Sequence, residues 1–163
     1  MEFLDIVDDQ DEVIAYASIR DIYNKNLPHR IVHVLIFNDK GDMALQKRSK
    51  EKDFCPGHWS TAVGGHVQQK EDYLTAAKRE FREELGADAE LEEFSKDVYL
   101  KPDGPKKFLT TFKAKFNGPF KENPEEVEKV DFFSLDKIQE MINSGEKFHP
   151  ELLFLLKKHF NLK

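Results

Sequence analysis

The alternation of apolar and polar residues predicts a chain built from both strands and helices. Apolar residues run almost without a break through Ile31–Phe37, which predicts a strand buried on both faces of a sheet. Residues 73–85 instead repeat apolar side chains every three or four positions, the period of a helix that buries one stripe. The stripe consists of Leu74, Ala77, Phe81 and Leu85. Asp72 is a suitable N-cap for this helix, and Gly86 a suitable residue to end it.

Turn and cap signals divide the rest of the chain into similar short elements. The predicted strands are Glu2–Val7, Val13–Tyr16, Ile31–Phe37, Met43–Lys47, Trp59–Val63, Glu90–Leu100, Lys107–Phe116 and Val130–Phe133. The other predicted helices are a short one that Ser18 caps, Leu135–Ile142 and Pro150–Phe160. Because strands lead into a helix and then return to strands, we expect an α/β (α+β) fold in which a mixed sheet lies between helices.

Length, charge and cysteine content narrow the class of protein. A chain of 163 residues suits one domain, which we divide into an N-terminal hairpin and helix over 1–27 and a core over 28–163. The net charge of −6 argues against nucleic-acid and acidic-membrane partners. Cys55 is the only cysteine, so no internal disulfide is expected. No apolar run reaches the roughly 18 residues of a membrane span, and we expect a cytoplasmic protein.

Three glutamates gather on one face of the helix predicted over 73–85. Positions i, i+3 and i+4 lie within an arc of about 100°, which places Glu80, Glu83 and Glu84 side by side. Like charges at this spacing repel by roughly a few tenths of a kcal/mol per pair, which favours a cation among them. Mg²⁺ is the obvious candidate, because it takes oxygen ligands from carboxylates, waters and phosphates. The alternative is a solvated charged face in which Arg79 pairs with Glu83.

The residues around these glutamates resemble the Nudix box. Its pattern is G-x5-E-x7-R-E-U-x-E-E-x-G-U, in which U is a bulky apolar residue, and Phe81 stands at the first U. The specified positions are matched by Gly65, Glu71, Arg79, Glu80, Glu83, Glu84 and Gly86. Ala87 at the last U is apolar but small, so looser packing is expected there. The PGHW segment before the box and the DFFSL segment after it are similar to segments that flank it in Nudix proteins.

The resemblance implies a Nudix-type α/β/α sandwich and a Mg²⁺-dependent hydrolase, with Mn²⁺ as a substitute metal. The substrate would be a small molecule with a diphosphate linkage, namely a nucleoside diphosphate linked to another moiety. The implied metal ligands are Glu80, Glu83 and Glu84. Arg79 and Glu71 are implied to brace the loop and the helix.

Catalysis needs a base that activates water, and the sequence leaves its identity open. The candidates are Glu83 in the box and the acidic residues Glu125, Glu126 and Glu128 after it. Our catalytic set is Glu83, Glu84, Arg79 and Glu126. Our substrate-binding set is Gly64, Gly65, His66 and Arg48, and the two glycines are also expected to form a tight loop before the helix. The particular substrate and the oligomeric state, a homodimer included, stay open.

Two other functions compete with hydrolysis. The N-terminal arm and the LQKRSKEKDFCPGHW stretch are similar to isopentenyl diphosphate isomerases, whose metal site of three histidines and two glutamates would use His29 and His66. Ile22 stands where the third histidine would fall, and Gly64 stands where the isomerase has its catalytic cysteine. The segment 95–121 contains no glutamate to complete the site. A non-catalytic ligand-binding module is the third function, and the intact box argues against it.

Several remaining residues have ordinary structural interpretations. We expect Trp59 to be a core aromatic, His29 and His33 to be hydrogen-bonded strand residues, and Cys55 to be a packed thiol. His66 could contact phosphate or only cap the loop. The lysines at 101, 106, 107, 113 and 115 could steer phosphates, but we favour solubilising charges on an edge strand.

Overall fold

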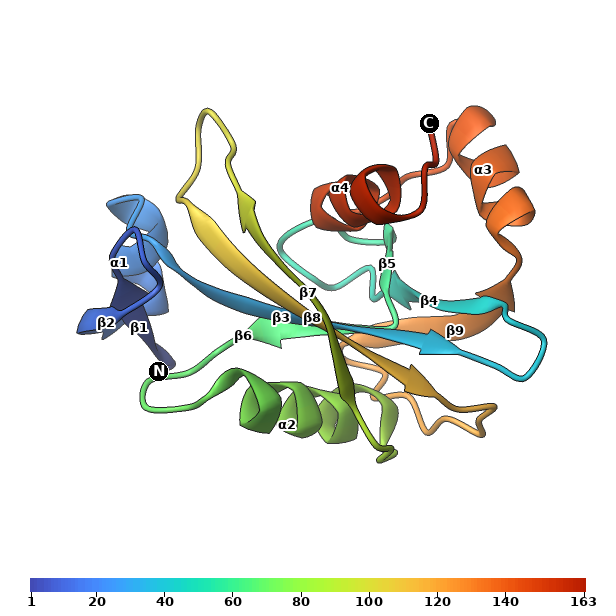
Figure 1. The fold of residues 1–163 in the computed structure, drawn as a ribbon, viewed down its shortest axis with the longest axis horizontal. Helices are drawn as coiled ribbons and strands as arrows, with labels where there is room; N and C mark the ends of the chain where they lie inside the picture. The colour runs from blue at the N-terminus through green and yellow to red at the C-terminus, as the bar shows by residue number, and fades with distance from the viewer.

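The computed structural model describes residues 1–163 as a seven-stranded mixed sheet flanked by helices, together with a two-stranded hairpin (Figure 1). The strands of the large sheet are β3 (His29–Phe37), β4 (Met43–Arg48), β5 (Trp59–Thr61), β6 (Val63–His66), β7 (Glu92–Tyr99), β8 (Lys107–Lys115) and β9 (Val127–Phe133). The helices are α1 (Ile19–Asn24), α2 (Tyr73–Leu85), α3 (Leu135–Asn143) and α4 (Pro150–His159). The hairpin pairs β1 (Phe3–Val7) with β2 (Val13–Ser18).

Strand β3 occupies the middle of the sheet. The path of paired strands is β5-β4-β3-β8-β7, with β6 added on β3 and β9 added on β4. β3 runs parallel to β8, and the other pairings in the sheet are antiparallel. Residues 31–36 of β3 are buried without exception, which confirms the predicted burial on both faces.

Two apolar clusters attach the helices to opposite faces of this sheet. Helix α2 packs on one face through Ala76, Ala77, Phe81 and Leu85. Helices α3 and α4 pack on the other face, where Ile138 and Leu152 meet Trp59, the expected core aromatic. Figure 1 shows α2 on one side of the strands and α3 and α4 on the other. The predicted mixed sheet between helical layers is therefore confirmed.

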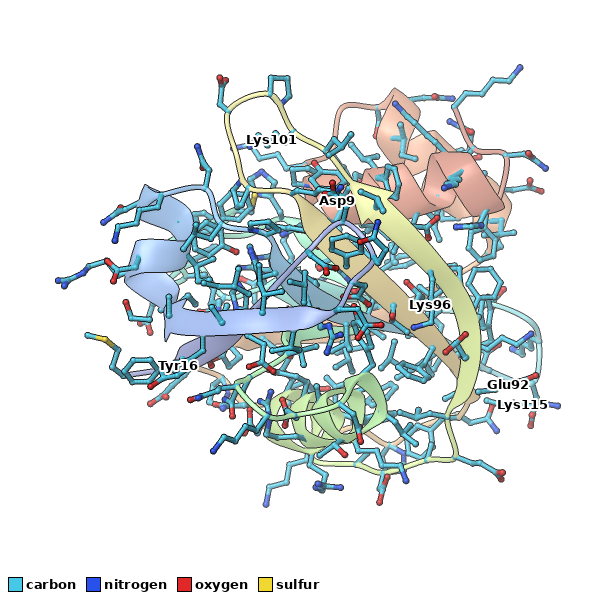
Figure 2. All side chains as sticks on the ribbon, turned by 60° about the vertical axis from the view of Figure 1, so that its left-hand side comes forward. Asp9, Tyr16, Glu92, Lys96, Lys101 and Lys115 are labelled. Carbon is cyan, nitrogen blue, oxygen red and sulfur yellow. The ribbon has the colours of Figure 1, made fainter.

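The N-terminal hairpin and helix form an extension at one end of the sheet (Figure 1). Leu4, Val7 and Ile22 of this extension are buried, and Leu4 forms an isolated bridge with Gln68. The outer side of β2 faces solvent, where Tyr16 points away from the body of the protein (Figure 2). The extension is thus held by its inner apolar residues. No helix of the chain has both the length and the apolar character needed to span a membrane.

Some predicted details are wrong. The single strand expected over 59–63 divides into β5 and β6, and β9 begins three residues earlier than expected, at Val127. Gly64 and Gly65 lie within β6, paired with β3, so they do not form a tight loop. Leu74 is 41% exposed, because the stripe of α2 that faces the sheet begins at Ala76 instead.

Candidate active site

Helix α2 presents the glutamates of the box, and its ends are fixed by local hydrogen bonds. The Asp72 side chain accepts from the Thr75 N–H at the first turn, and Gly86 ends the helix in the left-handed conformation. Its apolar stripe faces the sheet, so Glu80 and Glu84, which neighbour that stripe, are drawn toward β6 and β4. The predicted helix, with both of its caps, is confirmed.

Gly65 is needed because the Glu80 side chain lies directly against its backbone. A Cβ atom built on Gly65 would stand 2.3 Å from Glu80 Oε1 and 2.4 Å from Cδ. Any other residue there would push the carboxylate away. The reason for the glycine is therefore close approach, and no left-handed backbone is involved.

Arg79 joins the segment before the helix to the glutamates on it. Its guanidinium makes a two-point contact with Glu71, with Nε–Oε2 and Nη2–Oε1 distances of 2.8 and 2.9 Å. It also donates to the His66 carbonyl oxygen, to Glu80 Oε1 and to Glu83 Oε2. The geometry fits the bracing role implied for Arg79 and Glu71. It also realises the predicted Arg79–Glu83 ion pair, so the two interpretations of this helix face are not exclusive.

Glu80 and Glu84 form a pair of carboxyl groups, of which Glu84 is buried and Glu80 is half-buried. Burial is the main cause that raises the pKa of each, and the charge of Glu80 raises the pKa of Glu84 further. Gln46 donates to Glu84 Oε1 at 2.7 Å, while Arg79 donates to Glu80 and not to Glu84. A pair of neighbouring acids with a single cation beside one of them resists full ionisation.

The other acidic candidates lie further out. The Glu83 side chain is 55% exposed, and Glu126 forms an ion pair with Lys52. The carboxylate of Glu126 is still close enough to raise the pKa of Glu84. Glu128 pairs with Lys47 and Lys50 instead. As the side chains stand, no three acidic, histidine or cysteine residues surround a common point.

A cavity of about 320 Å³ opens beside Glu84. All four predicted substrate-binding residues line this cavity, namely Arg48, Gly64, Gly65 and His66. Arg48 donates to the carbonyl oxygens of Phe54 and Cys55, so it also holds the loop between β4 and β5. The remaining lining residues are Tyr23, Ile31, His33, Gln46, Phe54, Ser60, Glu84, Lys107, His149 and Glu151.

Two histidines, His66 at this cavity and His29 behind it, make internal hydrogen bonds. His29 is fully buried, and its Nδ1 donates to the Leu27 carbonyl oxygen, as expected of a structural strand residue. His66 Nε2 lies 2.7 Å from the Tyr23 hydroxyl. Burial lowers the pKa of His29 to about 4 and that of His66 to about 3, so both are neutral at physiological pH.

Sequence reasoning missed the wall of the cavity that β8, α1 and α4 build. Lys107 was expected to be a solubilising charge on an edge strand, and this is wrong. β8 lies inside the sheet between β3 and β7, and the Lys107 side chain pairs with buried Glu151 at 2.9 Å. Tyr23, His149 and Glu151 had no site role in the prediction. The one available signal was Glu151 in the first turn of the helix, directly before the apolar run of residues 152–156.

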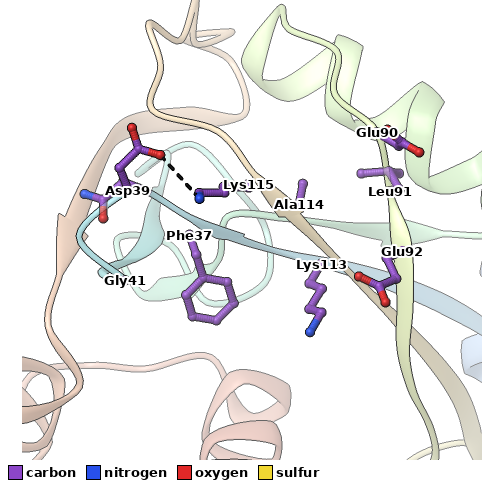
Figure 3. A pocket seen from close by; sticks show the side chains of 10 residues that line it. Phe37, Asp39, Gly41, Glu90, Leu91, Glu92, Lys113, Ala114 and Lys115 are labelled. Carbon is purple, nitrogen blue, oxygen red and sulfur yellow. Dashed lines mark ion pairs between the residues drawn. The ribbon is translucent and has the colours of Figure 1, made fainter.

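The largest cavity of the protein lies away from these residues. It is shallow and open, and Figure 3 shows its charged margin, with the Asp39–Lys115 ion pair on one side and with Glu92 of β7 and the preceding Glu90 on the other. None of the predicted site residues lines it. The smaller cavity beside α2 is therefore the candidate active site.

Comparison with known proteins agrees with this assignment. The sequence model of the NUDIX domain matches residues 27–156. An uncharacterized Nudix hydrolase of Yersinia pestis is 35% identical over 131 residues, which cover 80% of this chain and 71% of the relative. Isopentenyl-diphosphate Delta-isomerase 2 of Photorhabdus laumondii is 31% identical over 150 residues, which cover 88% of this chain and 84% of that protein.

A solved structure shares the fold over almost the whole chain. The crystal structure of DR0079 from Deinococcus radiodurans aligns with a TM-score of 0.82 at 23% identity, covering 96% of this chain and 98% of that one. The family model that matches residues 27–156 and the 35% identity to a Nudix hydrolase show that the chain belongs to the Nudix family. Within this family it is a hydrolase that acts on pyrophosphate bonds.

Proposed function

We propose that the protein hydrolyses the diphosphate linkage of a nucleoside diphosphate joined to another moiety, using Mg²⁺. The observation that carries this proposal is the neighbouring carboxyl groups of Glu80 and Glu84, where Glu84 is buried at the cavity and the only cation, Arg79, bonds to Glu80. Family membership supports the same reaction class.

The residues present fit a hard divalent cation. Glu80, Glu83 and Glu84 offer only carboxylate oxygens, the ligand type that Mg²⁺ prefers, and Mn²⁺ accepts the same set. A bound cation would favour the ionised form of the two acids, which burial alone disfavours. When bound, such a metal neutralises phosphate charge and acidifies a coordinated water. Arg79 would keep Glu80 and Glu83 in place through its hydrogen bonds.

The chain's own acids divide the remaining work. Glu126 is our first choice for the base that accepts a proton from water. Its charge raises the pKa of Glu84, so it lies near the site, and it is not one of the glutamates proposed to hold the metal. Lys52 pairs with Glu126 and would hold the carboxylate in position beside the site. Glu83 is the second candidate for the base, being exposed and hydrogen-bonded only to Arg79.

The test is a substrate screen with wild-type protein and with Glu84→Gln. The panel contains nucleoside triphosphates, sugar nucleotides, dinucleotides, coenzyme A and isoprenoid diphosphates, each with Mg²⁺ and with Mn²⁺. Glu84→Gln should lower kcat on the active substrate by on the order of 10²–10³, as expected when preorganised charge stabilisation is lost. Its melting temperature without metal should not fall, because the substitution removes a buried acid.

Glu92→Gln is the matched control, since Glu92 is exposed on β7 and lies outside the cavity. Undiminished turnover in Glu84→Gln would remove the face of α2 from the reaction. An isomerised product from an isoprenoid diphosphate would replace hydrolysis by the second candidate function, which the 31% identity to an isomerase keeps under test. Gly64 lacks a side chain for the isomerase cysteine, which is why hydrolysis ranks first.

A further inference from the structure

A series of hydrogen bonds links side chains on the wall of the cavity that α2 does not form. Thr61 Oγ1 lies 2.8 Å from His33 Nδ1, and His33 Nε2 lies 2.8 Å from Glu151 Oε1. The second oxygen of Glu151 accepts from Lys107 Nζ at 2.9 Å. Both His33 and Glu151 are buried, and Lys107 is nearly so. Buried charges at such distances are held in one arrangement, unlike solvated surface pairs.

Glu151 is the centre of this cluster and accepts through both of its carboxylate oxygens. Burial raises the pKa of Glu151, but the hydrogen bond from His33 and the charge of Lys107 hold that pKa well below its usual range. Glu151 is therefore ionised, and its two oxygens keep the His33 ring and the Lys107 ammonium in fixed positions. Both ring nitrogens of His33 are engaged, one by Glu151 and one by the Thr61 hydroxyl.

Arg48 adds a further positive charge at the same cavity. Its guanidinium contacts backbone oxygens of the loop and no carboxylate. The cavity thus has a cationic wall opposite in sign to the chain as a whole, whose net charge is −6. Such a local concentration of positive charge in a partly enclosed site attracts an anion.

Lys107 stands at the junction of two adjoining cavities. It lines the one beside Glu84 and also a second one of about 190 Å³, together with Tyr23, Phe54 and His149. Tyr99 and the segment from Lys101 to Pro105 also line the second cavity, in which aromatic rings lie among charged and polar side chains. A substrate with its diphosphate beside α2 and its attached group in the second cavity would pass directly over the Lys107 ammonium.

We propose that Lys107 is a substrate-binding residue, which contacts the diphosphate oxygens from the wall built by β8, α4 and α1 and needs no metal to do so. Glu151 and His33 are positioning residues that hold the ammonium at the cavity junction. Tyr23 belongs to the N-terminal extension, outside the span 27–156 that the family model matches, so this wall is partly particular to the extended chain. The identity of the anion as a diphosphate rests on the proposed function.

The test measures binding of inorganic pyrophosphate in EDTA, by calorimetry and by thermal shift, with the full-length chain. Wild-type protein should bind and be stabilised without any divalent cation. Lys107→Met should weaken pyrophosphate binding about tenfold or more, since a charge-assisted contact is lost. With the active substrate and metal, the same variant should raise KM by a similar factor and leave kcat within about twofold, a split that a merely structural role would not produce.

Lys113→Met is the matched control, because Lys113 lies on the same strand outside both cavities and should bind pyrophosphate as wild type does. Should Lys107→Met fail to fold because Glu151 loses a partner, Lys107→Met with Glu151→Gln removes both charges and carries the test. Wild-type affinity in either variant, or no binding by wild type in EDTA, would overturn the proposal. Metal-free binding through Lys107 combined with no hydrolysis of any substrate would instead refute only the proposed function.

Discussion

Two glutamates on different walls of one cavity have pKa values shifted in opposite directions, although both side chains are almost completely buried. Glu84 is 5% exposed and Glu151 is 4% exposed. Burial alone raises the pKa of a carboxyl group, and for Glu84 a second acid, Glu80, raises it further. For Glu151 the hydrogen bond from His33 and the charge of Lys107 outweigh burial and lower the pKa. Glu151 thus has a cation bonded to it, whereas Glu84 has none.

This difference separates a self-contained ion cluster from an acidic site that needs an added cation. Glu151 is paired with Lys107 within the protein, so the geometry of this ion pair is set by folding alone. The pair Glu80 and Glu84 has Arg79 on one side only, bonded to Glu80. The two walls therefore act on a diphosphate by different means, one through a bound metal and one through fixed side chains.

The largest effect expected among these comparisons comes from filling the space at Gly65 that the Glu80 carboxylate now occupies. We call the side of the site that carries Glu80, Glu83 and Glu84 the acidic wall. Gly65→Ala places a Cβ atom where Glu80 now lies, and the carboxylate must leave its position. We expect kcat to fall by on the order of 10², a loss comparable to that from misplacing one catalytic contact. Steady-state kinetics at varied Mg²⁺ would measure it. Glu92→Gln, outside both cavities, serves again as the control. Normal kinetics in Gly65→Ala would show that Glu80 does not need its present position.

A large loss of stability is expected from the other wall. Glu151→Gln leaves Lys107 and His33 buried without their anion, and breaking one partner of a buried ion pair costs about 3–5 kcal/mol. Urea unfolding would give the change in the free energy of unfolding. Glu140→Gln, on an exposed side chain of α3, should change it little. Equal stability in Glu151→Gln and wild type would mean that the cluster is not charged as described.

Asp97 is a second buried acid paired with basic side chains, and a smaller loss of stability is expected when it is replaced. It accepts from Lys158 and His159 of α4, which lower its pKa against the effect of burial. Asp97→Asn should cost about 1–2 kcal/mol at neutral pH, since the partners are partly exposed. Because the folded pKa is depressed, this stabilisation is complete above the unfolded value of 3.8 and is lost as pH falls through the folded value. Urea unfolding of both proteins at several pH values would measure it, and a difference that persists in strong acid would contradict the assignment.

The acidic wall could be predicted from sequence because its residues lie close together along the chain. Glu80, Glu83 and Glu84 fall on successive turns of one helix, and the caps at Asp72 and Gly86 mark its ends. The spacing of the box therefore fixes their relative placement before any long-range contact is known. The central strand and the layers of the fold followed from equally local patterns.

The cationic wall could not be predicted, because each of its contacts joins distant parts of the chain. His33 and Glu151 are 118 residues apart, and Lys107 and Glu151 are 44 apart. Whether Lys107 lies on an edge depends on which strand pairs with β8, and no local pattern shows that β3 does so in parallel. The exposure of Leu74 was missed for a similar reason, since the sheet reaches only part of α2.

Helix α4 is held by ion pairs at both of its ends. Glu151 in its first turn pairs with Lys107 at the candidate active site, and Lys158 and His159 in its last turn pair with Asp97 of β7. Because the helix is fixed at its C-terminal end, its N-terminal end can rotate little, so the contacts with Asp97 limit movement of the Lys107 ammonium. Weakening these contacts would thus affect substrate binding from more than one helical turn away, without altering any group that touches the substrate.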